Sequence, residues 1–91
     1  MKKLEIYIAR YCGTCRGLKK RIINIKESLI EVEIIFRDID IERDKVRKNN
    51  IENVPTIIFY IDNQEVSRLD GYISEEDILH LLDEAKWWMD Y

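Results

Sequence analysis

The sequence predicts an α/β fold in which a four-stranded mixed sheet is flanked by helices. Short runs rich in β-branched and aromatic residues alternate with runs whose apolar residues recur at helical spacing, in the order β-α-β-α-β-β-α. Two strands that are each followed by a helix predict parallel neighbours, to which a hairpin adds an antiparallel edge. With 91 residues, 46% of them hydrophobic, the chain has room for one core, so we expect a single domain over residues 1–91.

The first three elements are a strand, a helix and a second strand. Residues 4–9 form a short apolar run with β-branched and aromatic residues, which is typical of a strand. A helix then begins near Gly13. Its apolar face consists of residues at helical spacing: Leu18, Ile22, Ile25 and Leu29. Residues 32–36, VEIIF, return to strand composition.

A polar helix and a hairpin follow. Asp40 is the expected N-cap of this helix, which ends at Asn49-Asn50 because asparagine tolerates the left-handed conformation of many helix ends. Residues 56–61, TIIFYI, are the most apolar run and predict a central strand. Residues 62–65, DNQE, predict a turn that leads into a returning strand at residues 66–69.

The last helix starts with a capping box. Ser74 is the expected N-cap, Asp77 occupies the third helical position, and Ile73 and Ile78 are spaced as a hydrophobic staple. One face of the helix is apolar: Ile78, Leu81, Leu82, Ala85, Trp88 and Met89. We favour packing of residues 86–91, KWWMDY, on the sheet over their use as a docking or self-association patch.

Charge and hydrophobic patterning exclude several classes of protein. The net charge of −3 argues against a nucleic-acid platform. The first ten residues do not form a signal peptide, because Glu5 and Arg10 interrupt the apolar stretch. No run approaches the roughly 18 apolar residues of a membrane span. We therefore expect a cytoplasmic monomer that binds neither nucleic acid nor membrane.

Cys12 and Cys15 are the only cysteines of the chain. Three interpretations are open at first: a redox couple, half of a metal site, or two small apolar residues. A structural staple is disfavoured, because the cytosol keeps ordinary thiols reduced and the closed loop would be short. The strand before the pair and the helix after it place Cys12 in a loop and Cys15 in the first helical turn.

This placement favours a reactive thiolate. Backbone N–H groups at the start of a helix stabilise an anion, and Arg10 and Arg16 flank the pair. Cys12 should be accessible and attack a substrate disulfide, whereas Cys15 should be shielded and resolve the mixed disulfide. Gly13 between them permits the close approach of another chain.

Metal binding is the main alternative. A tetrahedral zinc site needs four ligands, but the chain has no third cysteine, and its one histidine, His80, lies on the last helix. A two-thiolate copper carrier also places Cys-x-x-Cys between a strand and a helix, yet it does not account for NVPT at residues 53–56. We expect no metal, and no cofactor other than the redox-active disulfide between Cys12 and Cys15.

Three features together resemble the thioredoxin superfamily, which includes thioredoxins and glutaredoxins. They are the aromatic-Cys-Gly-x-Cys run from Tyr11 to Cys15, the Val54-Pro55-Thr56 turn before the apolar strand, and Gly71 after the hairpin. They occur in the family's order, and the order of elements agrees over nearly the whole chain. The resemblance implies a thioredoxin-like fold.

The resemblance also implies how a substrate is held. Pro55 would be in the cis form beside the cysteines, and the Val54 backbone would pair with an incoming polypeptide as a short added strand. Gly71 would leave room for the substrate, with Tyr72 at the edge of the groove and Tyr11 as an apolar wall beside the attacking sulfur.

Two positions depart from the family. Thioredoxins have a buried acid in the strand before the cysteines, whereas this strand has Ile6, and the nearest acid, Glu5, is expected nearer the start of the strand. Deprotonation of Cys15 would then use water, a backbone group or the substrate. Thr14 replaces the usual proline, so we expect this substrate-facing position to make the couple more oxidising than the roughly −270 mV of thioredoxin.

The sequence thus predicts a thiol-disulfide oxidoreductase that reduces protein disulfides through its Cys-Gly-Thr-Cys motif. A flavoprotein reductase, a ferredoxin-linked reductase or glutathione would supply the electrons. Glutathione-dependent, glutaredoxin-type activity is one alternative, favoured by Tyr11 but disfavoured by the single glycine, Gly71, in LDGYISEED. The alternative from a different class is a metal-carrying or non-catalytic interaction module on the same fold.

Overall fold

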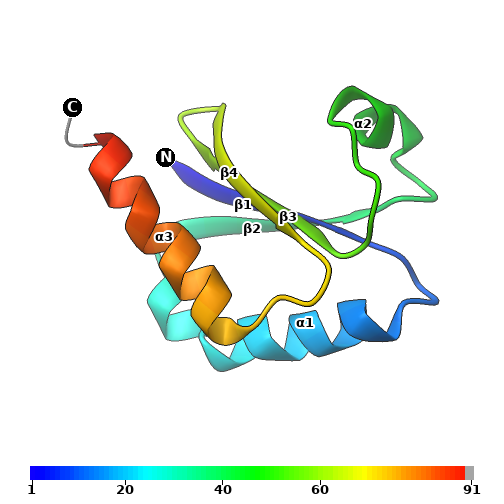
Figure 1. Ribbon diagram of the computed structural model, residues 1–91, viewed down its shortest axis with the longest axis horizontal. Coiled ribbons are helices and arrows are strands. Elements are labelled where there is room, and N and C mark those ends of the chain that lie inside the picture. The colour runs from blue at the N-terminus through cyan, green and yellow to red at the C-terminus, as the bar shows by residue number, and fades with distance from the viewer. Residues whose placement is uncertain (90–91) are drawn as a thin grey trace.

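The protein contains one four-stranded sheet with helices on both faces (Figure 1). The computed structural model describes the backbone of residues 1–89 and the side chains of residues 1–83. The strands are β1 (Lys2–Ile8), β2 (Val32–Asp38), β3 (Thr56–Ile61) and β4 (Gln64–Asp70). The helices are α1 (Gly13–Asn24), the 3-10 helix η1 (Lys26–Leu29), α2 (Arg43–Lys48) and α3 (Glu75–Met89). The predicted order of elements and mixed sheet are confirmed, and α1 and α3 lie on one face of the sheet with α2 on the other.

The strand order is β2-β1-β3-β4, so β1 and β3 are central. β1 runs parallel to β2, as predicted, with Ile8 opposite Asp38. The prediction that β3 is parallel as well is wrong, because β3 runs antiparallel to β1, with Ile6 opposite Ile57. The direction of β3 follows from the length of α2. This helix has only six residues, about 9 Å at 1.5 Å per residue, so it cannot carry the chain back along the sheet. β3 therefore starts at the end of the sheet where β2 stops.

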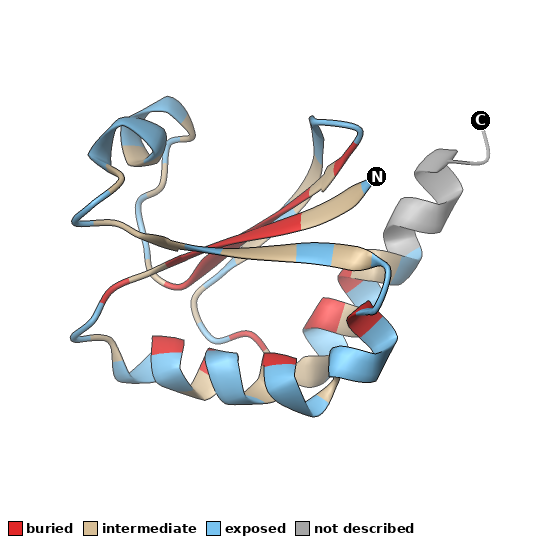
Figure 2. Cartoon of the chain, turned by 180° about the vertical axis from the view of Figure 1, so that it is seen from behind, coloured by how far each residue is buried: buried red, intermediate tan, exposed pale blue. Residues whose placement is uncertain are grey.

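The core lies between the sheet and the two helices α1 and α3 (Figure 2). Alternate residues of β1, Leu4 and Ile6, point to this face and are fully buried. Buried residues of the other elements meet them there: Leu18, Ile22, Leu29, Ile57, Phe59, Ile61, Ile73, Ile78 and Leu81. The position of α1, and hence of the cysteines before it, is determined by this apolar contact.

Two helix boundaries differ from the prediction. α1 ends at Asn24, and Leu29 reaches the core from η1 rather than from a longer α-helix. The expected N-cap Asp40 is wrong, because α2 starts after Glu42, which makes no side-chain cap bond. The Asp38 carboxylate instead accepts a hydrogen bond from the Asp40 backbone N–H at 2.9 Å, which forms a turn. The end of α2 is as predicted, since Asn50 has a positive φ of 54°.

The hairpin and the capping box of α3 are as predicted, but β4 starts at Gln64, so the turn consists of Asp62 and Asn63 rather than residues 62–65. Asp62 and Asn63 have φ values of 51° and 69°, which a two-residue hairpin turn needs. Ser74 and Asp77 exchange backbone-to-side-chain hydrogen bonds of 2.9 and 3.0 Å, which is the predicted capping box. The expectations for the side chains of residues 84–91, including Trp87 and Trp88, lie outside the described residues. Among the residues that the structure describes, no helix has the length and apolar character needed to cross a membrane.

Candidate active site

The two cysteines lie at the start of α1, as predicted. Cys12 is the N-cap of the helix and Cys15 is its third residue; they are paired as a disulfide with Cα atoms 5.2 Å apart. The Cys15 backbone N–H donates a hydrogen bond to the Cys12 sulfur at 3.1 Å. Cys12 thus occupies the position where a helix normally places a capping oxygen. An anionic sulfur there is stabilised by this N–H and by the positive end of the helix.

The two sulfurs differ in exposure. Cys15 is 2% exposed, whereas Cys12 is only half-buried. Cys12 is therefore the more accessible of the two cysteines. Thr14 and Gly13 between them are exposed, and a Cβ added to Gly13 would meet only the Arg16 side chain, at 3.6 Å. The first turn of α1 consequently leaves open space in front of Cys12.

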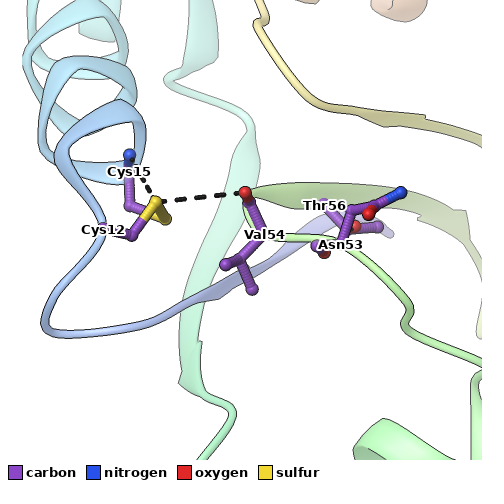
Figure 3. The surroundings of a disulfide bond; sticks show 5 residues. All are labelled: Cys12, Cys15, Asn53, Val54 and Thr56. Atoms are coloured by element: carbon purple, nitrogen blue, oxygen red, sulfur yellow. Dashed lines mark hydrogen bonds between the residues drawn. A yellow bond between two sulfur atoms is a disulfide. The ribbon is translucent and has the colours of Figure 1, made fainter.

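The loop before β3 lies next to the Cys12 sulfur (Figure 3). The Val54 carbonyl oxygen is 3.9 Å from this sulfur, and the Val54-Pro55 peptide bond is cis, as the resemblance implies. Two hydrogen bonds hold the loop: the Thr56 hydroxyl donates to the Asn53 carbonyl oxygen at 2.6 Å, and the Gly71 N–H donates to the Pro55 carbonyl oxygen at 3.1 Å. Residues far apart in the sequence are thereby placed around one sulfur.

An apolar hollow of about 230 Å³ extends from Val54 to Tyr11. Tyr11 is 74% exposed, so an apolar ring stands in solvent beside the cysteines. The hollow is completed by five residues that the sequence analysis did not assign to the site: the apolar Ile39, Val46 and Ile51 and the polar Glu52 and Asn53. Val46 could have been noticed, because it is the one apolar residue of α2.

Gly71 and Tyr72 follow the hairpin. Gly71 has a φ of +78°, and a Cβ there would have no atom within 4 Å, so the backbone conformation rather than lack of space explains the glycine. Tyr72 is 69% exposed, and the Arg21 guanidinium lies 4.4 Å from the centre of its ring. The Arg21 side chain also donates to the Ile73 carbonyl oxygen at 3.4 Å, which ties this corner to α1.

Glu5 lies in the middle of β1 rather than near its start, and it is 6% exposed. Its neighbours Leu4 and Ile6 face α1, so strand alternation places Glu5 on the opposite face of the sheet. Its carboxylate contacts the Arg37 guanidinium at 3.4 Å and the Lys3 ammonium at 3.3 Å. Burial raises the pKa of the carboxyl, but hydrogen bonds from Arg37 and Lys3 outweigh burial and leave the pKa below its ordinary value.

Tyr7 extends this cluster toward α2. Its hydroxyl donates to the Glu5 carboxylate at 3.1 Å and accepts from the Asn49 side-chain amide at 2.9 Å. Burial, together with the negative charge of Glu5, raises the pKa of Tyr7 to about 12. The cluster joins β1, β2 and the end of α2 on the face remote from α1, so Glu5 serves the packing of that face and does not reach Cys15.

Among the residues that the structure describes, no three or more His, Cys, Asp or Glu side chains are grouped so that they could hold a metal ion. His80 is exposed on α3. The geometry around the cysteines is that of a partly exposed cysteine, a shielded cysteine and an adjacent loop that contains a cis peptide bond. Such an arrangement can exchange a thiol pair for a disulfide.

Comparison with known proteins agrees with this geometry. Residues 3–84 match the family model described as Thioredoxin. The chain is 29% identical to a thioredoxin of Chlamydia pneumoniae over 77 residues, which cover 85% of this chain and 76% of that protein. It is also 29% identical to thioredoxin-2 of Saccharomyces cerevisiae over 65 residues, which cover 71% of this chain and 62% of the yeast protein. The X-ray structure of Fasciola hepatica thioredoxin superposes with a TM-score of 0.83 at 24% identity, over 91% of this chain and 79% of the other.

Proposed function

The chain belongs to the thioredoxin family and is a thiol-disulfide oxidoreductase, and on that premise we propose that it reduces disulfide bonds of other proteins. We assign the attack on the substrate to Cys12 and the resolving step to Cys15. The observation that carries this proposal is the contrast between the two cysteines: Cys12 is half-buried at the N-cap of α1, and Cys15 is 2% exposed.

The proposed reaction transfers two electrons to the substrate. The Cys12 thiolate attacks one sulfur of the substrate disulfide, forms a mixed disulfide and releases the first substrate thiolate. The Cys15 thiolate then attacks the Cys12 sulfur, releases the second substrate thiolate and leaves the Cys12–Cys15 disulfide. Both released thiolates take protons from their surroundings. Because the Cα atoms of the two cysteines are 5.2 Å apart, the second attack needs no large change of the backbone.

The substrate would lie across the loop before β3. The Val54 backbone offers its polar groups to an extended segment, and Tyr11 and the apolar hollow beside it accept a neighbouring side chain. We assign Gly71, Tyr72, Gly13 and Thr14 to the same substrate groove, as the resemblance implies. We propose protein disulfides as the substrate class on this ground, with a reductase or glutathione as the electron donor and the cytoplasm as the location.

Two variants test the assignment in an insulin-reduction assay with dithiothreitol as the electron donor. Cys12→Ser should abolish the activity, since no accessible thiol remains. Cys15→Ser, reduced beforehand and then freed of dithiothreitol, should carry out the first step on insulin and accumulate a mixed disulfide that mass spectrometry detects. Full turnover by Cys12→Ser, or the absence of any mixed disulfide in Cys15→Ser, would contradict the roles. Stoichiometric Cu(I) binding without reduction of insulin would support a metal-carrying module instead.

A further inference from the structure

The resolving step needs an acceptor for the proton of Cys15. A thiol attacks a disulfide only as the thiolate, and Cys15 is shielded from bulk water. The strand before the cysteines does not supply a base, because Ile6 is the residue that faces α1 and Glu5 lies on the other face of the sheet. A side-chain acceptor for this proton would therefore belong to another element on the α1 face.

Asp38 is on that face. It is the last residue of β2 and lies opposite Ile8 of β1, and paired residues of neighbouring strands share a face. Two residues earlier, Phe36 packs under the Lys19 ammonium of α1, 5.0 Å from the ring centre. The same side of β2 thus continues from the contact with α1 to the Asp38 carboxylate.

Asp38 and Cys15 line one cavity of about 290 Å³ between the end of the sheet and α1. A water molecule occupies about 30 Å³ in the liquid, so the cavity has room for water between the two groups. Ile8 forms its apolar wall, and Arg16 and Lys19 border it from α1. The Asp38 side chain is 20% exposed, which makes it a largely enclosed carboxylate.

The carboxylate is held in a defined position. One oxygen accepts the Asp40 backbone N–H at 2.9 Å, and the other lies 3.4 Å from the Arg10 guanidinium nitrogen Nε. The Ile39 N–H donates to the Ile8 carbonyl oxygen at 3.0 Å, which fastens the end of β2 to β1 just after Asp38. These contacts orient Asp38 without using Cys15, and Asp38 lines the cavity together with Cys15.

We propose that Asp38 accepts the proton of Cys15, through water in this cavity, during the resolving step. The inference rests on the proposed function, in which Cys15 resolves the mixed disulfide. The proton passes from the Cys15 sulfur to water and from water to the carboxylate, while the sulfur electron pair attacks Cys12 and the substrate sulfur leaves as a thiolate. When the disulfide is reduced again, the proton returns by the same route to the departing Cys15 thiolate.

The charged groups around the cavity favour this transfer. Arg10 faces it from the loop after β1, and Arg16 and Lys19 face it from α1. Their positive charges stabilise the Cys15 thiolate as it forms. Asp38 is the one carboxylate among the residues that line this cavity, while Asp40 holds the turn outside it. The cavity thus pairs a proton acceptor with cations that stabilise the product of deprotonation.

Asp38→Asn tests the proposal, because asparagine keeps the shape and can still accept the Asp40 N–H. The probe is 5,5′-dithiobis(2-nitrobenzoate), a symmetrical aromatic disulfide that releases a coloured thiolate in each step. The rate of the first release depends on the concentration of the probe and reports the attack by Cys12. The rate of the second release does not depend on that concentration and reports the resolving step by Cys15. We expect Asp38→Asn to slow the second release by about a hundredfold at pH 7, the lower end of what a positioned base contributes, and to leave the first release unchanged.

The pH profile separates proton transfer from a structural effect. The difference between wild type and Asp38→Asn in the rate of the second release should shrink as the pH approaches about 8.5, where an ordinary cysteine thiol ionises without a base. Asp40→Asn removes the same charge from the same turn and should leave both releases unchanged, and Asp38→Glu should restore part of the second rate. An unchanged second release in Asp38→Asn, or an equal loss in both releases at every pH, would overturn the role of Asp38. Loss of the mixed disulfide in Cys15→Ser would instead overturn the proposed function.

Discussion

Replacing Glu5 by glutamine should destabilise the fold without altering its shape. The side chain is buried at 6% exposure, and its carboxylate lies within 3.4 Å of the cationic groups of both Arg37 and Lys3. Glutamine can still accept the hydrogen bond of the Tyr7 hydroxyl. Its amide group, however, would point N–H donors at two cations that are themselves donors.

The expected loss can be worked out from these contacts. Removing one partner of a buried ion pair costs about 3–5 kcal/mol. Arg37 keeps a second partner, since Glu42 lies 2.9 Å from its other nitrogen, and the lost contacts are long, at 3.3 and 3.4 Å. We therefore expect a loss of about 2 kcal/mol in the free energy of unfolding at pH 7, in the range of hydrogen bonds to charged groups. For a domain of this size that lowers Tm by about 8–16 °C.

The pH dependence gives an independent check. The folded pKa of Glu5 is lowered, so the unfolded chain binds the proton more readily. The stabilisation is then fully present above the unfolded pKa of about 4.3 and disappears as the pH falls through the folded value. The difference between wild type and Glu5→Gln, measured by urea unfolding of the oxidised proteins, should shrink toward zero below about pH 4.

The matched control is Glu65→Gln. Glu65 also pairs with an arginine, Arg68, at 2.7 Å, but both side chains are more than a third exposed, so the loss should stay below about 1 kcal/mol. A Glu5→Gln protein as stable as the control, or a difference from wild type that grows in acid, would refute the reasoning.

Two further outcomes are expected. Ser74→Ala removes one half of the capping box of α3 and should cost about 1 kcal/mol in urea unfolding, whereas Ser28→Ala in η1 should be neutral; equal effects would contradict the importance of the cap. The Cys12–Cys15 couple should have a reduction potential above about −270 mV in glutathione buffers, and Thr14→Pro should lower it; a wild-type value below −270 mV would contradict the role given to Thr14.

Local patterns predicted most of the fold. Sequence periodicities predicted the four strands and the three α-helices, and the capping box and the left-handed Asn50 were visible in a few neighbouring residues. The sequence did not reveal that α1 ends and η1 begins, because Ile25 and Leu29 have the spacing that is expected of one continuous α-helix. Asp40 was assigned as an N-cap because it has the right side chain, but the Asp38 carboxylate takes its N–H in a turn. The direction of β3 depended on the length of α2, and helix ends are the least certain feature of a sequence pattern.

In the candidate active site, too, features formed by adjacent residues could be predicted from the sequence, whereas contacts between distant segments could not. The cysteine pair and its place at a helix start follow from adjacent residues. The position of Val54 beside Cys12 could be expected only from the resemblance, since the two residues meet through the fold. Ile39 and Ile51 of the apolar hollow, and Asp38 beside Cys15, gave no signal, because their proximity depends on strand register and on where the chain turns.

Strand alternation explains why the buried Glu5 and the partly exposed Asp38 have different roles. Successive residues of β1 point to opposite faces, so Glu5 can be neutralised by Arg37 and Lys3 while Ile6 completes the apolar contact with α1. An acid at the position of Ile6 would have to be desolvated inside that contact. Asp38 avoids this cost, because it lies at the end of a strand, where Arg10 and a backbone N–H can still reach it. The stability of the sheet and the proton transfer at Cys15 thus depend on different faces, and a change in Glu5 should leave the resolving step untouched.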